Sequence, residues 1–211
     1  MKYSIRKILA LILLTIIAIG GCGKKESENP DFTIGAWNGN VFENSWLNMK
    51  FEIDDQWTVA SDEKIAEISG IGAEILSELK GTSKENFEAM AKITTVYGFM
   101  VLKGEGDPSI QLVFENLAKT TAGTQTTEEE YLDMVLDQLT GLGYEIIEET
   151  RDEKIADKTF KKLKLSAYEG LLTQDFYCYK QDDYIVSIIT TYTDATESDT
   201  EEFIDNISVL K

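Results

Sequence analysis

The chain has 211 residues, of which 38 are acidic and 20 basic, and its formal net charge at pH 7 is −18. A surface this acidic is repelled by nucleic acid, whose affinity for proteins comes largely from basic contacts to phosphate, so nucleic-acid binding is excluded. The sequence contains no histidine, which excludes Ser-His-Asp and Cys-His nucleophiles and removes the most common zinc ligand.

Residues 1–21 have the pattern of a secretory signal peptide. Their start is positively charged, through Lys2, Arg6 and Lys7. The apolar run from Ile8 to Ile19 follows, and its 12 residues are too few to span a hydrocarbon core, which needs about 20. Such a segment is the signal of a lipoprotein, an ordinary secretory signal or an uncleaved membrane anchor, and the residues that follow distinguish these alternatives.

The end of this segment, Ile19-Gly20-Gly21-Cys22, resembles the lipobox of secreted bacterial lipoproteins. The resemblance implies cleavage between Gly21 and Cys22 and attachment of lipid to the Cys22 thiol. Two or more acyl chains hold a protein firmly on a membrane, whereas one chain binds weakly. We therefore expect a lipid-anchored protein on the outward face of a bacterial cell membrane, with the membrane as its first partner.

The rest of the chain divides into a tether and one domain. Residues 22–39 are polar and lack a strand or helix period, so we expect a lipidated cysteine followed by a flexible tether. Residues 40–211 show no second change of composition, and a domain of this size buries roughly 70% of its unfolded surface. We expect a single domain.

Strands and helices of this domain are predicted from hydrophobic period and turn residues. A hairpin is expected at 40–43 and 47–53, in which Met49, Phe51 and Ile53 alternate with polar residues. A helix begins at Ser61, with interruptions at Gly70 and Gly72, and a short helix begins at Ser83. A second hairpin follows at 94–103 and 110–116.

The second half begins with a helix from Thr127 to about Leu142, because Thr127 and Glu130 form a capping box. Its apolar stripe comprises Tyr131, Leu132, Val135, Leu136 and Leu139. Four strands follow at 144–149, 159–168, 171–180 and 184–192, with turns at 152–153, 169–170 and 181–183. A last helix begins near Ser198 or Asp199, with Phe203, Ile204, Ile207 and Val209 facing inward. This order predicts the α+β class, a mainly antiparallel sheet flanked by helices.

The segment from Val41 to Trp57 resembles the start of PsbP-like domains, which read Tyr-x-Asn and then aliphatic-x-Phe-x-x-Pro-x-x-Trp. Phe42 stands where tyrosine is usual, and Asp54 lies close to the usual proline. The resemblance implies an antiparallel sheet flanked by helices. It also implies a binding or accessory role without a shared set of catalytic residues.

Two groups of residues are candidate ligand contacts. Trp37, within the expected tether, is the best candidate for an exposed aromatic ring that contacts a sugar or peptide, whereas core packing is the alternative for the tryptophans of the first hairpin. Lys161, Lys162 and Lys164 belong to the one basic concentration of the chain. Lys162 and Lys164 share a strand face and Lys161 lies on the other. These lysines bind an anionic ligand or pair with acidic neighbours.

Two other features have structural explanations. The acidic run from Asp194 to Glu202 lacks the glycine turn and ligand spacing of a calcium loop, and acids in a first helical turn complement the helix dipole, so no metal site is expected. Cys178 shares a strand face with Leu172 and Phe176, which predicts a buried, unreactive thiol.

These features predict a non-enzymatic binding or accessory module of the cell envelope, with no cofactor and an unknown protein, peptide or envelope ligand. A histidine-free hydrolase that uses two carboxylates about 5–10 Å apart in a cleft is the main alternative. A passive envelope spacer is a third possibility.

Overall fold

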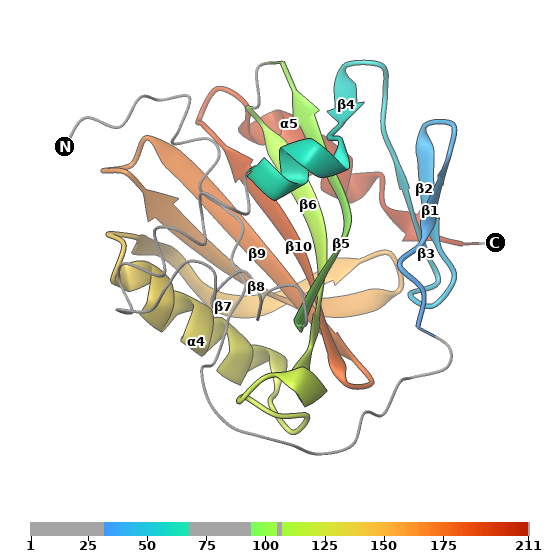
Figure 1. Cartoon of the computed structure of the whole chain (residues 1–211). Helices are drawn as coiled ribbons and strands as arrows, with labels where there is room; N and C mark the ends of the chain where they lie inside the picture. The colour runs from blue at the N-terminus through green and yellow to red at the C-terminus, as the bar shows by residue number, and fades with distance from the viewer. Residues whose placement is uncertain (1–31, 68–93, 105–106, 211) are drawn as a thin grey trace.

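The computed structural model describes residues 32–67, 94–104 and 107–210 (Figure 1). Within these ranges the strands form two sheets in which every described pairing is antiparallel, and helices pack against them. This arrangement confirms the predicted α+β class. The predictions for residues 1–21, for Cys22, for Gly70 and Gly72 and for the helix at Ser83 lie outside the described residues.

The smaller sheet has the strand order β1-β2-β3-β11. Its strands are β1 (Ala36–Asn38), β2 (Val41–Asn44), β3 (Met49–Glu52) and β11 (Ser208–Val209). The β2–β3 hairpin was expected, and its Met49 and Phe51 side chains are buried as the alternation predicts. The β11 strand was not expected, because Val209 was assigned to the inner face of the last helix.

The prediction of a tether over residues 22–39 is wrong at its end, because β1 pairs with β2. The buried Asn44 side chain donates hydrogen bonds to the carbonyls of Thr33 and Ile34 at 2.9 and 3.0 Å. The Phe32 ring stacks on Tyr184 with centroids 4.3 Å apart. The polar composition of this segment did not indicate these contacts, because their partners lie elsewhere in the sequence.

The larger sheet has the order β4-β5-β6-β10-β9-β8-β7. The strands are β4 (Trp57–Val59), β5 (Thr95–Lys103), β6 (Ser109–Asn116), β7 (Glu145–Ile155), β8 (Lys158–Ala167), β9 (Leu172–Gln181) and β10 (Tyr184–Tyr192). The second hairpin and the four-strand meander were therefore predicted correctly, and β4 was not expected. The turn predicted at Asp152-Glu153 is wrong, since β7 continues to Ile155 and Ala156 takes the positive φ of 54°.

Helix α4 (Glu128–Thr140) covers one face of the larger sheet along β7, β8 and β9 (Figure 1). Its predicted capping box is present: Thr127 Oγ1 accepts from the Glu130 N–H, and the Glu130 carboxylate accepts from the Thr127 N–H. Four of the five predicted stripe residues are buried, and Leu136 is only half-buried. The short 3₁₀ helix η1 (Leu117–Lys119) follows β6 on the way to α4.

Helix α5 (Glu197–Asp205) packs on the opposite face of the sheet. Alternate residues of β10 belong to the two cores: Ile185 and Ile189 pack with α4, whereas Val186 and Ile188 pack with α5 and the smaller sheet. The helix begins at Thr196 as N-cap, earlier than predicted. None of the helices formed by the described residues is both long and apolar enough to cross a membrane.

Candidate binding site on the larger sheet

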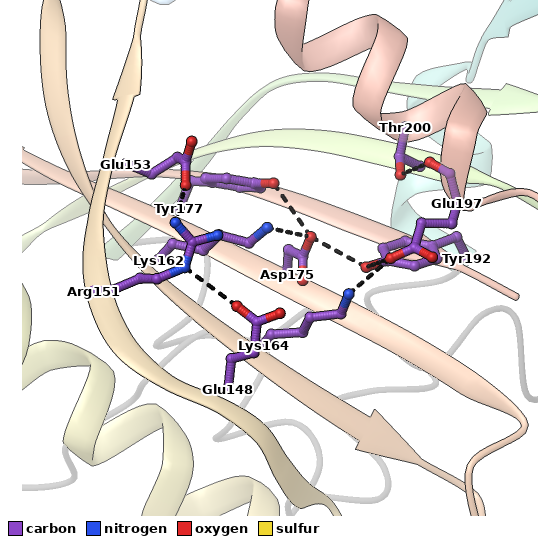
Figure 2. Close-up of polar contacts among 10 residues, drawn as sticks. All are labelled: Glu148, Arg151, Glu153, Lys162, Lys164, Asp175, Tyr177, Tyr192, Glu197 and Thr200. Atoms are coloured by element: carbon purple, nitrogen blue, oxygen red, sulfur yellow. Dashed lines mark hydrogen bonds and ion pairs between the residues drawn. The ribbon is translucent and has the colours of Figure 1, made fainter. Parts of the chain in front are cut away.

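A cluster of paired charges occupies the sheet face opposite α4, where β7, β8, β9 and β10 lie side by side (Figure 2). We call this cluster the charged face. It comprises Glu148, Arg151, Glu153, Lys162, Lys164, Asp175, Tyr177, Tyr192 and Glu197. Strand register brings its members together, because residues paired across neighbouring strands point to the same side.

Asp175 lies at the centre of the charged face. Its Oδ2 atom accepts hydrogen bonds from the hydroxyls of Tyr177 and Tyr192, each at 3.2 Å, and lies 3.0 Å from Lys162 Nζ. Its Oδ1 atom is buried and has no hydrogen-bond partner within the described part of the chain. Because a buried carboxyl group is costly without hydrogen-bond partners, these three donors explain how the Asp175 side chain is accommodated in the sheet.

Lys164 connects the sheet to helix α5. Its Nζ atom lies 2.7 Å from Glu197 Oε1, and the Tyr192 hydroxyl is 3.4 Å from the same oxygen. Both lysines also lie over aromatic rings, with Lys162 Nζ 4.9 Å from the ring centre of Tyr177 and Lys164 Nζ 5.7 Å from that of Tyr192. Such cation–π contacts hold the ammonium groups in place.

The exposed rim of the charged face comes mainly from β7. Arg151 forms ion pairs with Glu148, at 3.2 Å, and with Glu153 (Figure 2). Two register shifts in the β7–β8 pairing, on either side of Glu148, interrupt the regular alternation of this strand. Arg151 and Glu148 are 49% and 44% exposed, so the rim presents charges of both signs to solvent.

Four groups of the charged face, Tyr177, Tyr192, Lys164 and Glu197, have pKa values that are shifted away from neutrality. Burial, followed by the Asp175 charge, raises the pKa of Tyr177 and of Tyr192, so both phenols remain protonated donors. Burial lowers the pKa of Lys164, but its hydrogen bond to Glu197 and nearby carboxylate charges raise it by more. The hydrogen bond from Lys164 lowers the pKa of Glu197. None of these four groups exchanges a proton easily near neutrality.

Sequence reasoning placed only part of this site. Lys162 and Lys164 lie together on the charged face, and Lys161 lies on the other face, as expected. Lys161 Nζ is 2.6 Å from Glu129 and 2.7 Å from Asp152, and the hydrogen bonds to Asp152 and then Glu129 raise its pKa. Each of the three predicted lysines thus has a carboxylate partner.

Trp37 does not lie at an exposed position in a tether. Its ring packs against Phe42 and Phe99 with centroids 5.4 and 5.6 Å away, and the side chain is half-buried. The expectation of an exposed Trp37 is therefore wrong, because β1 places this ring on the core between the two sheets.

Sequence reasoning missed Asp175, Tyr177, Tyr192 and the acidic partners on β7 and α5. A signal was present in the predicted strand 171–180, where Asp175 and Tyr177 alternate with apolar Phe176 and with Cys178.

Cys178 itself is fully buried and contacts Ser187 Oγ at 3.4 Å, and burial raises the pKa of its thiol to about 12. The predicted burial of this thiol is confirmed, and its lack of reactivity stays a prediction.

The acidic side chains of the charged face were compared with the requirements of a metal site. Among residues 32–67, 94–104 and 107–210, no group of three acidic or cysteine side chains is arranged to hold a metal ion. The charges of the face bind one another instead, through the contacts drawn in Figure 2.

No protein-family model and no curated protein matches this chain. Among solved structures, it matches LpqN, which is involved in cell envelope biogenesis of Mycobacterium tuberculosis, at 11% identity and a TM-score of 0.42 over 76% of this chain and 82% of that one. It also matches the cyanobacterial PsbP (CyanoP) of Synechocystis sp. PCC 6803, at 12% identity and a TM-score of 0.45 over 90% of this chain and 98% of that one.

Proposed function

We propose that this chain is a lipid-anchored, outward-facing bacterial lipoprotein whose domain binds a polar component of the cell envelope without catalysing a reaction. The anchor rests on the charged start, the short apolar run and the small residues before Cys22. The binding role rests on the charged face. Its Arg151–Glu148 pair is half-exposed, and the Lys162–Asp175 pair beneath it is buried.

The observation that carries the binding role is this fixed arrangement of charges. Glu148 and Arg151 on β7 and Glu197 on α5 are between 40% and 49% exposed, while the ion pairs below them restrain the strand and the helix. A preorganised surface with both signs of charge loses little entropy on binding and favours a partner of complementary pattern.

The pKa shifts of Glu197, Tyr177, Tyr192 and Lys164 favour binding over hydrolysis. A carboxylate hydrolase needs one group that donates a proton and one that accepts it near the working pH. On the charged face the pKa of Glu197 is lowered and the pKa values of Tyr177, Tyr192 and Lys164 are raised. These shifts move the groups away from neutrality, which is the opposite of what a general acid or base requires.

Crosslinking on intact cells tests this proposal. A photoreactive amino acid replaces Glu197 on the charged face in one variant and Asp133, an exposed residue of α4 on the other face, in the control. We expect the variant at position 197 to capture a component that the control does not. Identical capture by both variants would favour a passive spacer and contradict the proposal.

Two further measurements separate binding from catalysis. Replacing Arg151 with glutamate reverses one charge of the exposed rim, and we expect it to reduce the capture from position 197 because the charge pattern is altered. The captured component is then incubated with the unmodified full-length protein. Recovery of this component intact supports binding, whereas its cleavage supports the hydrolase alternative.

A further inference from the structure

A cleft with a volume of about 340 Å³ lies between α5, the end of β3 and the β4–β5 pair. None of its lining residues belongs to the charged face. The lining consists of Asn40, Glu52, Ile53, Asp54, Trp57, Lys103, Asp199, Glu202, Phe203 and Asn206. A cavity of this volume is in the range of small-ligand sites, so its chemistry merits a separate explanation.

One wall of the cleft is a single face of α5. Asp199, Glu202 and Phe203 are spaced by three and four residues, so they project from the same side of the helix. The opposite wall is held by two hydrogen bonds between Asn40 and Ile53, one from a side chain and one from the backbone. Asn40 Nδ2 donates to the Ile53 carbonyl at 2.9 Å, and the Ile53 N–H donates to the Asn40 carbonyl at 3.0 Å.

The cleft already accommodates one alkylammonium group, which is its own Lys103. Lys103 Nζ lies 2.8 Å from Asp199 Oδ1 and 5.9 Å from the centre of the Trp57 ring. The Trp57 ring in turn packs edge-on against Phe203, with centroids 5.6 Å apart. A carboxylate beside an aromatic face is the combination that recognises organic ammonium ions.

The other carboxylates of the cleft have no cationic partner within the part of the chain that the structure describes. Among the described residues, Glu52, Asp54 and Glu202 have no ion-pair partner, while Lys103 is paired with Asp199. The Asp54 carboxylate is oriented by the Gln56 N–H, which donates to its Oδ1 at 2.8 Å. Three acids that lack an ion pair with any described residue, grouped around a partly enclosed space, create a negative potential that attracts cations.

We propose that this cleft binds an organic polycation, a ligand with two or more primary ammonium groups. A linear polyamine and a lysine-rich peptide segment share this chemistry. A metal ion does not fit, because no described group of three acids is arranged to ligate one. The apolar side chains of Ile53, Trp57 and Phe203 suit the methylene groups between ammonium ions.

Calorimetric titration of the full chain with spermidine tests the proposal. We expect saturable binding that weakens about threefold in Glu202→Gln and about tenfold in the double variant Glu52→Gln, Glu202→Gln, since each removes one charge facing the ligand. Glu201→Gln is the matched control: it makes the same change on the same helix, outside the cleft lining. Its affinity should equal that of the unaltered protein.

Parallel titrations distinguish the source of the ammonium groups. Tighter binding of a tetralysine peptide than of spermidine assigns the cleft to a peptide segment, and the reverse order assigns it to a polyamine. Both ligands should lose affinity at high salt. The proposal is overturned if neither ligand binds saturably, if Glu201→Gln weakens binding as much as Glu202→Gln, or if Ca²⁺ binds the cleft and displaces spermidine.

Discussion

Lys162 on β8 and Asp175 on β9 form an ion pair with Nζ 3.0 Å from Oδ2, and their side chains are only 12% and 6% exposed. Their strands are antiparallel neighbours, and the register places Asp175 opposite Lys164 and Tyr177 opposite Lys162. The ion pair is therefore diagonal across the sheet. This geometry lets one carboxylate accept from Lys162 and from two phenols at once.

We expect Asp175→Ala to lower the free energy of unfolding by about 3–5 kcal/mol, because it leaves Lys162 buried without a counter-charge. It also removes the acceptor of the Tyr177 and Tyr192 hydroxyls. Urea unfolding at pH 7 measures the loss. The double variant Lys162→Met, Asp175→Leu should recover most of it, since apolar residues of similar volume replace a buried pair at little cost.

A matched comparison uses Lys161, whose partners Glu129 and Asp152 are 62% and 64% exposed. Lys161→Met should change stability far less than Asp175→Ala, because exposed ion pairs contribute little. Equal losses in the two variants would show that burial does not control the energy of these pairs.

Leu139→Ala should destabilise the domain by about 2–5 kcal/mol, because its side chain is fully buried between α4 and the sheet. Leu136→Ala on the same helix is the control. Leu136 is only half-buried, so its truncation leaves a smaller cavity and should cost less. Unfolding free energies from urea titrations compare the two, and a larger loss in Leu136→Ala would contradict this packing of α4.

Stability should fall at alkaline pH. Burial raises the pKa of the Cys178 thiol from 9.0 to about 12, so the unfolded chain releases this proton first. The stabilisation is complete below about pH 9 and is lost as the pH rises towards 12. Burial also raises the pKa of Tyr177 and of Tyr192. These phenols therefore add to the loss of unfolding free energy at alkaline pH. Urea unfolding between pH 7 and 11 measures the decline.

The contribution of the thiol is isolated by Cys178→Ala. One proton changes the unfolding free energy by at most about 1.4 kcal/mol per pH unit, and this part of the slope should disappear in the variant. The native protein should also resist alkylation at Cys178 and react only after unfolding. Rapid alkylation of the folded domain would contradict the buried position of this thiol.

Cys22→Ser should prevent lipid attachment, because serine lacks the thiol that carries the diacylglycerol, and the precursor should remain uncleaved. Labelling of cells with a radioactive or clickable fatty acid, followed by electrophoresis, measures both outcomes. Normal cleavage and labelling of the variant would reject the lipoprotein assignment. The same experiment on Cys178→Ser is the control, in which labelling should persist.

The local elements of the fold follow closely from the sequence. The capping box of Thr127 and Glu130 begins α4 as predicted, because its contacts involve neighbouring residues only. The alternation at Met49 and Phe51 likewise identified a half-buried strand. The turn assigned to Asp152-Glu153 is wrong because charged residues are typical of turns, whereas here Asp152 forms a cross-strand ion pair with Lys161 of β8. Glu153 pairs with Arg151 along β7 itself.

The candidate sites were much less predictable. The two-residue period of a strand predicted that Lys162 and Lys164 share one face of β8. It did not predict which residues contact them there. Asp175 reaches Lys162 through strand register, and Glu197 reaches Lys164 because α5 packs on the same face. The cleft joins Glu52 to Lys103 and to Asp199, which are far apart in the chain.

The sequence by itself therefore determined the class of fold, the helix and strand faces and the inward position of Cys178, since these depend on local period and on burial of apolar groups. Only the tertiary structure decided which of the described charges pair with one another and which acids gather around the cleft. The physical reason is that an ion pair depends on a separation of a few ångströms between side chains. Strand register and helix packing set that separation, and residues far apart in the chain determine both.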